Sequence, residues 1–243
     1  MNGMLFTTPT NKKMKIALCF SGQPRFAENG YPYYKGNLID HYDTDTFVHI
    51  WNDPDKVGLP YEGGLGQKYD IQSPETPSKI LDLYKPKKFL CEPQKKFEIY
   101  EKCNTCSKDP SVVYSMFYSR FMANKLKSEY EKENNFKYDV VFYTRFDFAL
   151  NTKFDFSSLD LSYVYIPDFD TFNDQCGFGS SLVIDMACDI YNKINEYCES
   201  GVMLMGEDML KKQILNVTTK INYNHPFFPD KYGCSRHSLI RPQ

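Results

Sequence analysis

The chain has 243 residues and a formal net charge of −2, and hydrophobic residues make up 42% of it and aromatic residues 16%. This length and apolar content are enough for one large domain with a sizeable core, and they argue against a disordered chain. The nearly balanced charge gives no basic field for nucleic acid, and no apolar run is long enough to cross a membrane.

The first predicted elements alternate between strand and helix. Residues 14–22 (MKIALCFSG) and 44–53 (TDTFVHIWND) are apolar runs that end in polar residues, as buried parallel strands do. A short helix is predicted from Pro77, followed by a third strand over 88–91. Strand, helix and strand joined by short links indicate right-handed parallel crossovers.

The rest of the chain continues this alternation around two irregular segments. Residues 54–74 are expected to form a long loop, and residues 92–110 an insertion such as a hairpin. The further predictions are helices over 111–134, 180–201 and 206–217 and strands within 138–150 and 162–168. In the first of these helices Val113, Phe117 and Phe121 form an inward stripe, and 127–134 (KSEYEKEN) is expected to be solvated.

These elements predict an α/β fold with a central mixed, mostly parallel sheet flanked by helices. We expect a flexible leader over 1–14, which lacks the apolar core of a signal peptide, and a single domain over 15–243. The eight cysteines are then expected to be reduced thiols in the cytoplasm. The CNTC motif at 103–106 has no second cysteine pair nearby, so it does not by itself indicate a zinc site.

Ligands of open α/β sheets bind at the carboxyl ends of the strands, so the residues that follow each strand are the candidates. The loop after the first strand (SGQPRF, 21–26) combines a tight turn, exposed backbone N–H groups and a fixed cation, which suits a phosphate. The candidates at the first two strand ends are Ser21, Gly22, Gln23, Arg25, Asn52 and Asp53.

Arg145 and Asp147 lie two residues apart near the end of another apolar strand, YDVVFYTRFDFAL (138–150). Side chains at this spacing point the same way, so the two could simply pair with each other. Alternatively, Asp147 holds Mg²⁺ or Mn²⁺ together with the phosphates of a ligand, and Arg145 contacts the ligand or orients Asp147.

Two further polar clusters contain carboxylates. Asp174 and Gln175 lie in a loop with two glycines (DQCGFGS, 174–180), and Glu207 and Asp208 lie in the first turn of a helix. The second pair could serve only to complement the helix dipole. As a catalytic base it would need burial to oppose the dipole, because the dipole lowers the pKa of a carboxyl group.

Six motifs follow one another in order between about residues 15 and 215: SGQPR (21–25), FVHIW (47–51), the helix at 114–131, RFD (145–147), DQCGFGSS (174–181) and GED (206–208). In this order they resemble the GT-A-fold glycosyltransferases, in particular a small family of large DNA viruses and bacteria. The resemblance implies a Rossmann-like GT-A domain. It also implies, for a viral protein, a place in the host cytoplasm.

The resemblance further implies a hexosyl- or pentosyltransferase that uses a nucleotide sugar, with a UDP-sugar favoured, and a glycan, glycoprotein or other hydroxyl acceptor. Reaction with inversion and Mn²⁺ or Mg²⁺ is implied too, with Asp147 as metal ligand, although Arg145 stands where the family has an acid. Asp208, or else Glu207, takes the position of the base. The other implied contacts are Ser115, Tyr118 and Lys125 to the donor, Asp174 and Gln175 to the sugar or acceptor, and His225 to the metal.

Two other functions stay open at this point. One is a non-catalytic module that binds a nucleotide or sugar, and the other is a different phosphate-handling α/β enzyme. A P-loop kinase is disfavoured because the chain has no G-x-x-x-x-G-K-[ST] motif. His49, inside an apolar strand, is expected to be a core histidine with its hydrogen bonds satisfied.

Overall fold

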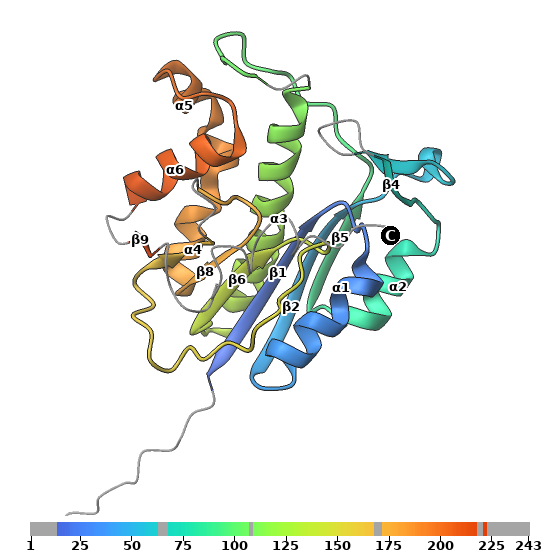
Figure 1. The fold of residues 1–243 in the computed structure, drawn as a ribbon, viewed down its shortest axis with the longest axis vertical. Helices are drawn as coiled ribbons and strands as arrows, with labels where there is room; N and C mark the ends of the chain where they lie inside the picture. Colours follow the sequence, from blue (N-terminus) through green and yellow to red (C-terminus); the bar gives the residue numbers. More distant parts are fainter. Residues whose placement is uncertain (1–13, 63–67, 107–108, 168–171, 218–220, 223–243) are drawn as a thin grey trace, which may run out of the picture.

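A seven-stranded sheet in the order β5-β2-β1-β6-β8-β7-β9 forms the centre of the molecule (Figure 1). The computed structural model describes residues 14–62, 68–106, 109–167, 172–217 and 221–222. The strands are β1 (Lys15–Gly22), β2 (Asp43–Trp51), β5 (Lys88–Glu92), β6 (Val140–Thr144), β7 (Val164–Tyr165), β8 (Gly177–Gly179) and β9 (Ile221–Asn222). Neighbouring strands are parallel except that β8 is antiparallel to both β6 and β7. The predicted mixed, mostly parallel sheet is confirmed.

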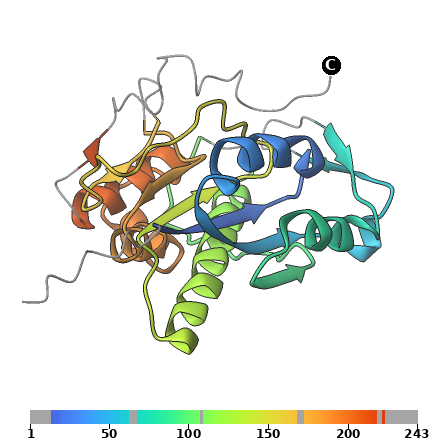
Figure 2. The ribbon, with the colours of Figure 1, turned by 90° about the horizontal axis from the view of Figure 1, so that it is seen from below.

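Helices cover both faces of the parallel half of this sheet. Helices α1 (Ala27–Tyr34) and α2 (Thr76–Tyr84) pack on one face, and α3 (Ser111–Asn134) packs on the other (Figure 2). Because side chains alternate along a strand, Leu18 and Phe20 of β1 meet the first pair of helices. Ala17 and Cys19 face α3. The continuous apolar run of β1 therefore reflects burial on two sides.

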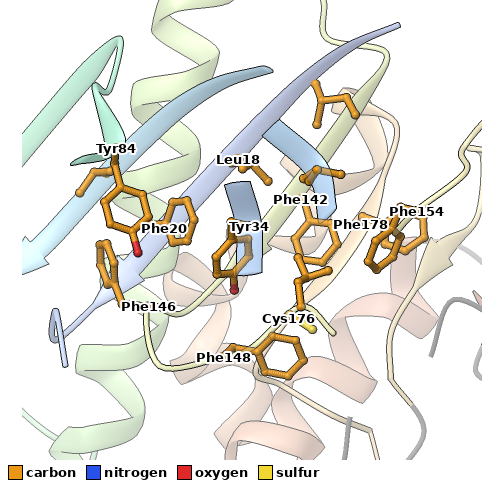
Figure 3. Close-up of a cluster of buried hydrophobic side chains, with 14 of the residues drawn as sticks. Leu18, Phe20, Tyr34, Tyr84, Phe142, Phe146, Phe148, Phe154, Cys176 and Phe178 are labelled. Carbon is orange, nitrogen blue, oxygen red and sulfur yellow. The ribbon is translucent and has the colours of Figure 1, made fainter. Parts of the chain in front are cut away.

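A cluster of aromatic rings fills the α1/α2 face of the sheet (Figure 3). Phe20 lies at its centre, with its ring centroid 4.8 Å from Tyr34, 4.7 Å from Tyr84 and 5.1 Å from Phe146. Full burial of each such side chain stabilises the fold by roughly 1.5–3 kcal/mol. Because Phe146 lies beyond the end of β6, this cluster also fixes the loop that follows the strand.

The chain after β8 differs from the single helix predicted over 180–201. It forms α4 (Ser181–Ala187), a 3-10 helix η3 (Asp189–Lys193) and α5 (Ile194–Glu199), followed by α6 (Gly206–Val217). The change of helix type after Ala187 lets Ile190 and Ile194 both bury in one cluster with α6. The predictions for α3 and α6 are confirmed in position.

Residues 54–74 are more ordered than the predicted loop. They contain a short 3-10 helix, η2 (Pro54–Lys56), and an antiparallel pair of strands, β3 (Pro60–Glu62) and β4 (Lys68–Ile71). Gly58 has a φ of 84°, so it supplies the left-handed turn that precedes β3.

Residues 93–106, which we call the strap, follow β5 without forming the predicted hairpin. A disulfide joins Cys103 of the strap to Cys198 of α5, and the amide of Leu204 donates to the carbonyl of Asn104 at 2.7 Å. The expectation of reduced thiols is wrong for Cys103 and Cys198, because the fold brings two cysteines 95 residues apart into contact. The other described cysteines are free thiols, and Cys234 lies outside the described residues.

Among the described residues, no helix has the length and hydropathy needed to cross a membrane. The expected leader lies outside the described residues except for Met14. The single domain over 15–243 stays a prediction.

Candidate functional site

The loop after β1 is held by a chain of buried hydrogen bonds. Gly22, at a φ of 102°, donates its amide hydrogen to the Ser119 hydroxyl of α3 at 2.6 Å. The Ser119 oxygen lies 2.6 Å from Nδ1 of His49, and His49 Nε2 lies 2.9 Å from a carboxylate oxygen of Glu92. Because the Glu92 carboxylate can only accept, Nε2 carries the proton and donates to it, and Nδ1 of the neutral ring then accepts from the Ser119 hydroxyl.

His49 is therefore a core histidine with both ring nitrogens bonded, as predicted. Its burial lowers its pKa, against the effect of Glu92, so the ring is neutral at pH 7. The same series of hydrogen bonds corrects the prediction for the backbone N–H group of Gly22. Its amide was predicted to be exposed for a phosphate, but it is already used inside the protein. In this loop Ser21 is buried, and Gln23 and Arg25 are half-buried.

Asp147, after the end of β6, is shared by two guanidinium groups. Arg145 donates through Nε to one carboxylate oxygen at 2.9 Å and through a terminal nitrogen to the other at 2.7 Å. Arg25, from the loop after β1, lies 3.1 Å from the second oxygen. We call Arg25, Arg145 and Asp147 the arginine trio. The pairing of Arg145 with Asp147 is the simpler of the two alternatives given by the sequence, and Arg25 joins it.

The aromatic core positions this trio. Between the two charged residues Phe146 turns inward and stacks on Phe20 at an interplanar angle of 24°. The Tyr34 hydroxyl lies 2.6 Å from the Thr144 hydroxyl and donates to the Arg145 carbonyl at 3.1 Å. These contacts fix the backbone on both sides of Arg145, so the Arg145 side chain extends from a rigid turn.

The trio has a net positive charge, because two cations surround one anion. Asp147 is only 4% exposed. Burial acts to raise its pKa, but the charges of Arg145 and Arg25 outweigh burial and hold the pKa below its usual value. A carboxylate has about four lone-pair sites, so Asp147 keeps sites for a further contact, and the two guanidinium groups beside it act against a cation there.

No group of three or more His, Cys, Asp or Glu side chains within the described ranges could hold a metal ion. The other predicted ligand, His225, lies outside those ranges. Metal ligation by Asp147 stays a prediction.

A second cluster, of carboxyl groups, lies at the start of α6. Asp174 packs so closely on Gly206 that a β-carbon there would lie 2.0 Å from its carboxylate oxygen, so a larger residue at this position would displace Asp174. Burial raises the pKa of Glu207, and the nearby Asp174 and Asp208 charges add to the increase. Burial thus opposes the helix dipole at Glu207, as a base at this position requires, and the choice between Glu207 and Asp208 stays a prediction.

Both clusters lie at the same edge of the sheet. β8 runs antiparallel to β6, and Gly177 pairs with Tyr143, so the residues just before β8 lie where β6 ends. Arg120 of α3 donates to the Asp174 carbonyl and lies over the Tyr143 ring, 4.6 Å from its centroid. Arg120 therefore fixes the Asp174 loop to the helix behind the sheet.

Most of the remaining predicted residues have partners within the protein, and their roles in binding stay predictions. Asn52 accepts from the Tyr61 hydroxyl at 2.8 Å, and Asp53 caps η2 through the Asp55 amide at 3.1 Å. Ser115 and Tyr118 of α3 contact Gln94 and Lys95 of the strap. Lys125 is exposed, and the amide of Gln175 donates to Asn173.

Sequence reasoning missed Ser119, Glu92 and Arg120. Only Arg120 gave a signal, as a cation in the apolar part of a helix.

No protein-family model matches the sequence, and no curated protein matches it either. Among solved structures, the fold is similar to a glycosyltransferase involved in the glycosylation of the major capsid of PBCV-1. The two share 10% identity with a TM-score of 0.41, over 88% of this chain and 82% of that one. An active-site mutant of LgtC gives 10% identity and a TM-score of 0.46, over 88% and 73% of the two chains. At these TM-scores the likeness identifies neither an activity nor a ligand for this chain.

Proposed function

We propose that the chain is a glycosyltransferase that moves a sugar from a nucleotide diphosphate sugar, with UDP as the favoured nucleotide, to a hydroxyl of a glycan. One observation carries the proposal: a net positive arginine trio and a carboxyl group with a raised pKa lie at one edge of the sheet. The first suits a diphosphate and the second suits a base. The ordered motifs of the sequence support the same function.

In the proposed reaction Arg25 and Arg145 contact the diphosphate of the donor. As the bond between the anomeric carbon and the diphosphate oxygen breaks, negative charge collects on the leaving group, and the two guanidinium groups stabilise it. The acceptor oxygen attacks from the opposite face of the sugar, which inverts the anomeric centre. Its proton passes to the Glu207 carboxylate, or to Asp208 beside it.

The metal ion is a separate part of the proposal. Mn²⁺ or Mg²⁺ would add positive charge at the diphosphate, with Asp147 as its ligand. Because the trio places two guanidinium groups on Asp147, we assign the reaction no step that depends on the ion.

The proposal is tested with a panel of UDP- and GDP-sugars. The protein is first screened for thermal stabilisation by each compound, with Mn²⁺ and with EDTA, and release of nucleoside diphosphate is then measured for the compounds that stabilise it. We expect stabilisation and release with at least one UDP-sugar. Stabilisation without release under any acceptor would instead support the non-catalytic binding module. Release of inorganic phosphate would support another phosphate-handling enzyme, and no stabilisation at all would end the proposal.

A further inference from the structure

A pocket of about 370 Å³ lies beside the candidate site rather than in it. Its walls come from the strap, from the first turn of α3 and from the η3–α5 segment. In Figure 1 the green strap loops around the end of α3 that lies near α5. The volume falls within the range of about 300–1,000 Å³ that is usual for small-molecule sites.

Aromatic rings from each of these three segments line the pocket. They are Phe97 of the strap, Tyr114 of α3 and Tyr191 of η3. The Phe97 ring centroid is 6.2 Å from each of the other two rings. Phe97 and Tyr191 are only partly buried, so they present ring surface to the pocket. Such surface stacks against the C–H groups of a sugar ring, because the face of an aromatic ring is negative and those hydrogens are slightly positive.

Two amides complement these rings. The Tyr114 hydroxyl donates to Oδ1 of Asn195 at 2.9 Å, and Nδ2 of Asn192 donates to Asp189 at 2.6 Å. Within the described part of the chain, the Asn195 amino group and the Asn192 carbonyl oxygen have no partner of their own. One donor and one acceptor therefore lie beside the rings, which is what a hydroxyl group requires.

The charge of the pocket favours a neutral ligand. Its wall has one cation, Lys96, and one anion, Glu98, and these cancel. A nucleotide or phosphate site would need an excess of positive charge, as in the arginine trio.

A row of rings connects the pocket to the candidate site. The Tyr191 ring lies 5.0 Å from Tyr118, and Tyr118 stacks on Trp51 with centroids 5.4 Å apart at an angle of 23°. Trp51 ends β2 next to Asn52. We propose that this pocket binds a neutral sugar ring of a glycan. The further step, that this glycan is the acceptor of the transfer reaction, rests on the proposed function.

The binding itself is tested without any nucleotide. Neutral tetrasaccharides of glucose, galactose, mannose and N-acetylglucosamine are titrated against the full chain by saturation-transfer NMR. A proline-rich decapeptide is the competing probe, because such peptides also dock in aromatic-lined grooves. We expect at least one saccharide to bind, and Phe97→Ala and Tyr191→Ala to weaken its affinity by about tenfold or more. The control is Tyr33→Ala, which removes a 41% exposed tyrosine from α1 and should leave the affinity unchanged.

Asn192→Trp provides a second variant that alters no buried side chain. Asn192 is exposed, so a large ring there fills the pocket without disturbing the core, and saccharide binding should be lost while the melting temperature is kept. No binding by any saccharide, equal binding by all variants, or binding of the peptide alone would overturn the proposal. Because no donor is present, these results are independent of the transferase assay. Saccharide binding without any transferase activity would contradict the proposed function but still support the saccharide site.

Discussion

Just after β6 a nearly buried carboxylate contacts two arginine side chains, which come from the segments that follow two different strands. These contacts fix the positions of both guanidinium groups. Arg145 is the more exposed of the two, with 27% of its side chain accessible against 12% for Arg25. It is therefore the better placed to exchange part of its contact with Asp147 for contact with a bound anion.

The first prediction concerns Arg145. We expect Arg145→Gln to weaken UDP binding by about tenfold or more, since a hydrogen bond to a charged group contributes about 1.5–3 kcal/mol. Isothermal titration calorimetry measures the affinity. The control is Lys35→Gln, which removes one positive charge from the exposed ion pair between Lys35 and Asp40. If both variants bind UDP equally well, Arg145 has no part in the site.

The second prediction distinguishes the two carboxyl groups at the start of α6. Glu207→Gln should lower kcat by about 10²–10⁴-fold, which is the usual contribution of a general base, whereas Asp208→Asn should have a smaller effect. The base acts as carboxylate, so kcat of the unmodified protein should rise with pH through the raised pKa of Glu207. This rise should vanish in Glu207→Gln. A larger loss in Asp208→Asn would return the base to Asp208.

At the scale of the element, α3 connects the sheet to both clusters, and its second half holds a buried ion network. Lys127 is 0% exposed and lies 2.6 Å from Asp185 of α4 and 3.1 Å from Glu131. The Ser181 hydroxyl also donates to Glu131 at 2.6 Å. Burial acts to raise the pKa of both carboxyl groups, but the surrounding charges and hydrogen bonds hold each below its usual value.

The third prediction is that Lys127→Met lowers the free energy of unfolding by about 3 kcal/mol, because it removes the buried cation of Glu131 and Asp185 and leaves them only the exposed Lys137. Urea unfolding measures the change. Lys125→Met, on an exposed position of the same helix, should change it by less than about 0.5 kcal/mol. Because the folded protein lowers the pKa values of Glu131 and Asp185, their ionised forms stabilise the fold at pH values above the pKa of the unfolded chain. This stabilisation is lost as the pH falls through the lowered pKa values. The difference between the two variants should therefore shrink in acid, and a constant difference would contradict the network.

The ion network also shows where sequence reasoning stops. The 111–134 helix was predicted at its observed bounds, because its length and apolar spacing are local properties. Its KSEYEKEN end was predicted to be solvated, yet Lys127 and Glu131 are buried. A charge pattern does not reveal which partner a fold will bring beside it, and here the partner comes from α4.

At the scale of the whole molecule, the sequence predicted that candidate residues from different strand ends lie close together, and Arg25, Arg145 and Asp147 do meet. It missed how they pair. Arg25 reaches Asp147 across 122 positions of the chain, and Cys103 reaches Cys198 across 95. Neither contact follows from local spacing. The mostly parallel character of the sheet, by contrast, could be predicted, because short links between alternating strands and helices allow few topologies.

The fourth prediction concerns that disulfide. For a bridge between residues 95 positions apart, loop-closure entropy alone gives about 4.7 kcal/mol, and disulfides typically stabilise a fold by about 2–4 kcal/mol. Cys103→Ser should therefore lower the melting temperature, and dithiothreitol should lower that of the unmodified protein by a similar amount but leave the variant unaffected. Cys106→Ser, at an exposed free thiol of the same strap, is the control. Equal melting temperatures for all three proteins would mean that the strap is held by its other contacts alone.

The row of rings gives the protein an optical property. Trp51 is the only tryptophan of the chain, and it is 3% exposed between His49 and Tyr118. Its fluorescence therefore comes from one location, the end of β2 beside the aromatic pocket. With excitation at the red edge of the absorption band, binding of the proposed donor or glycan nearby should change the emission of this one indole group. Donor and glycan titrations can thus be followed in the unlabelled protein.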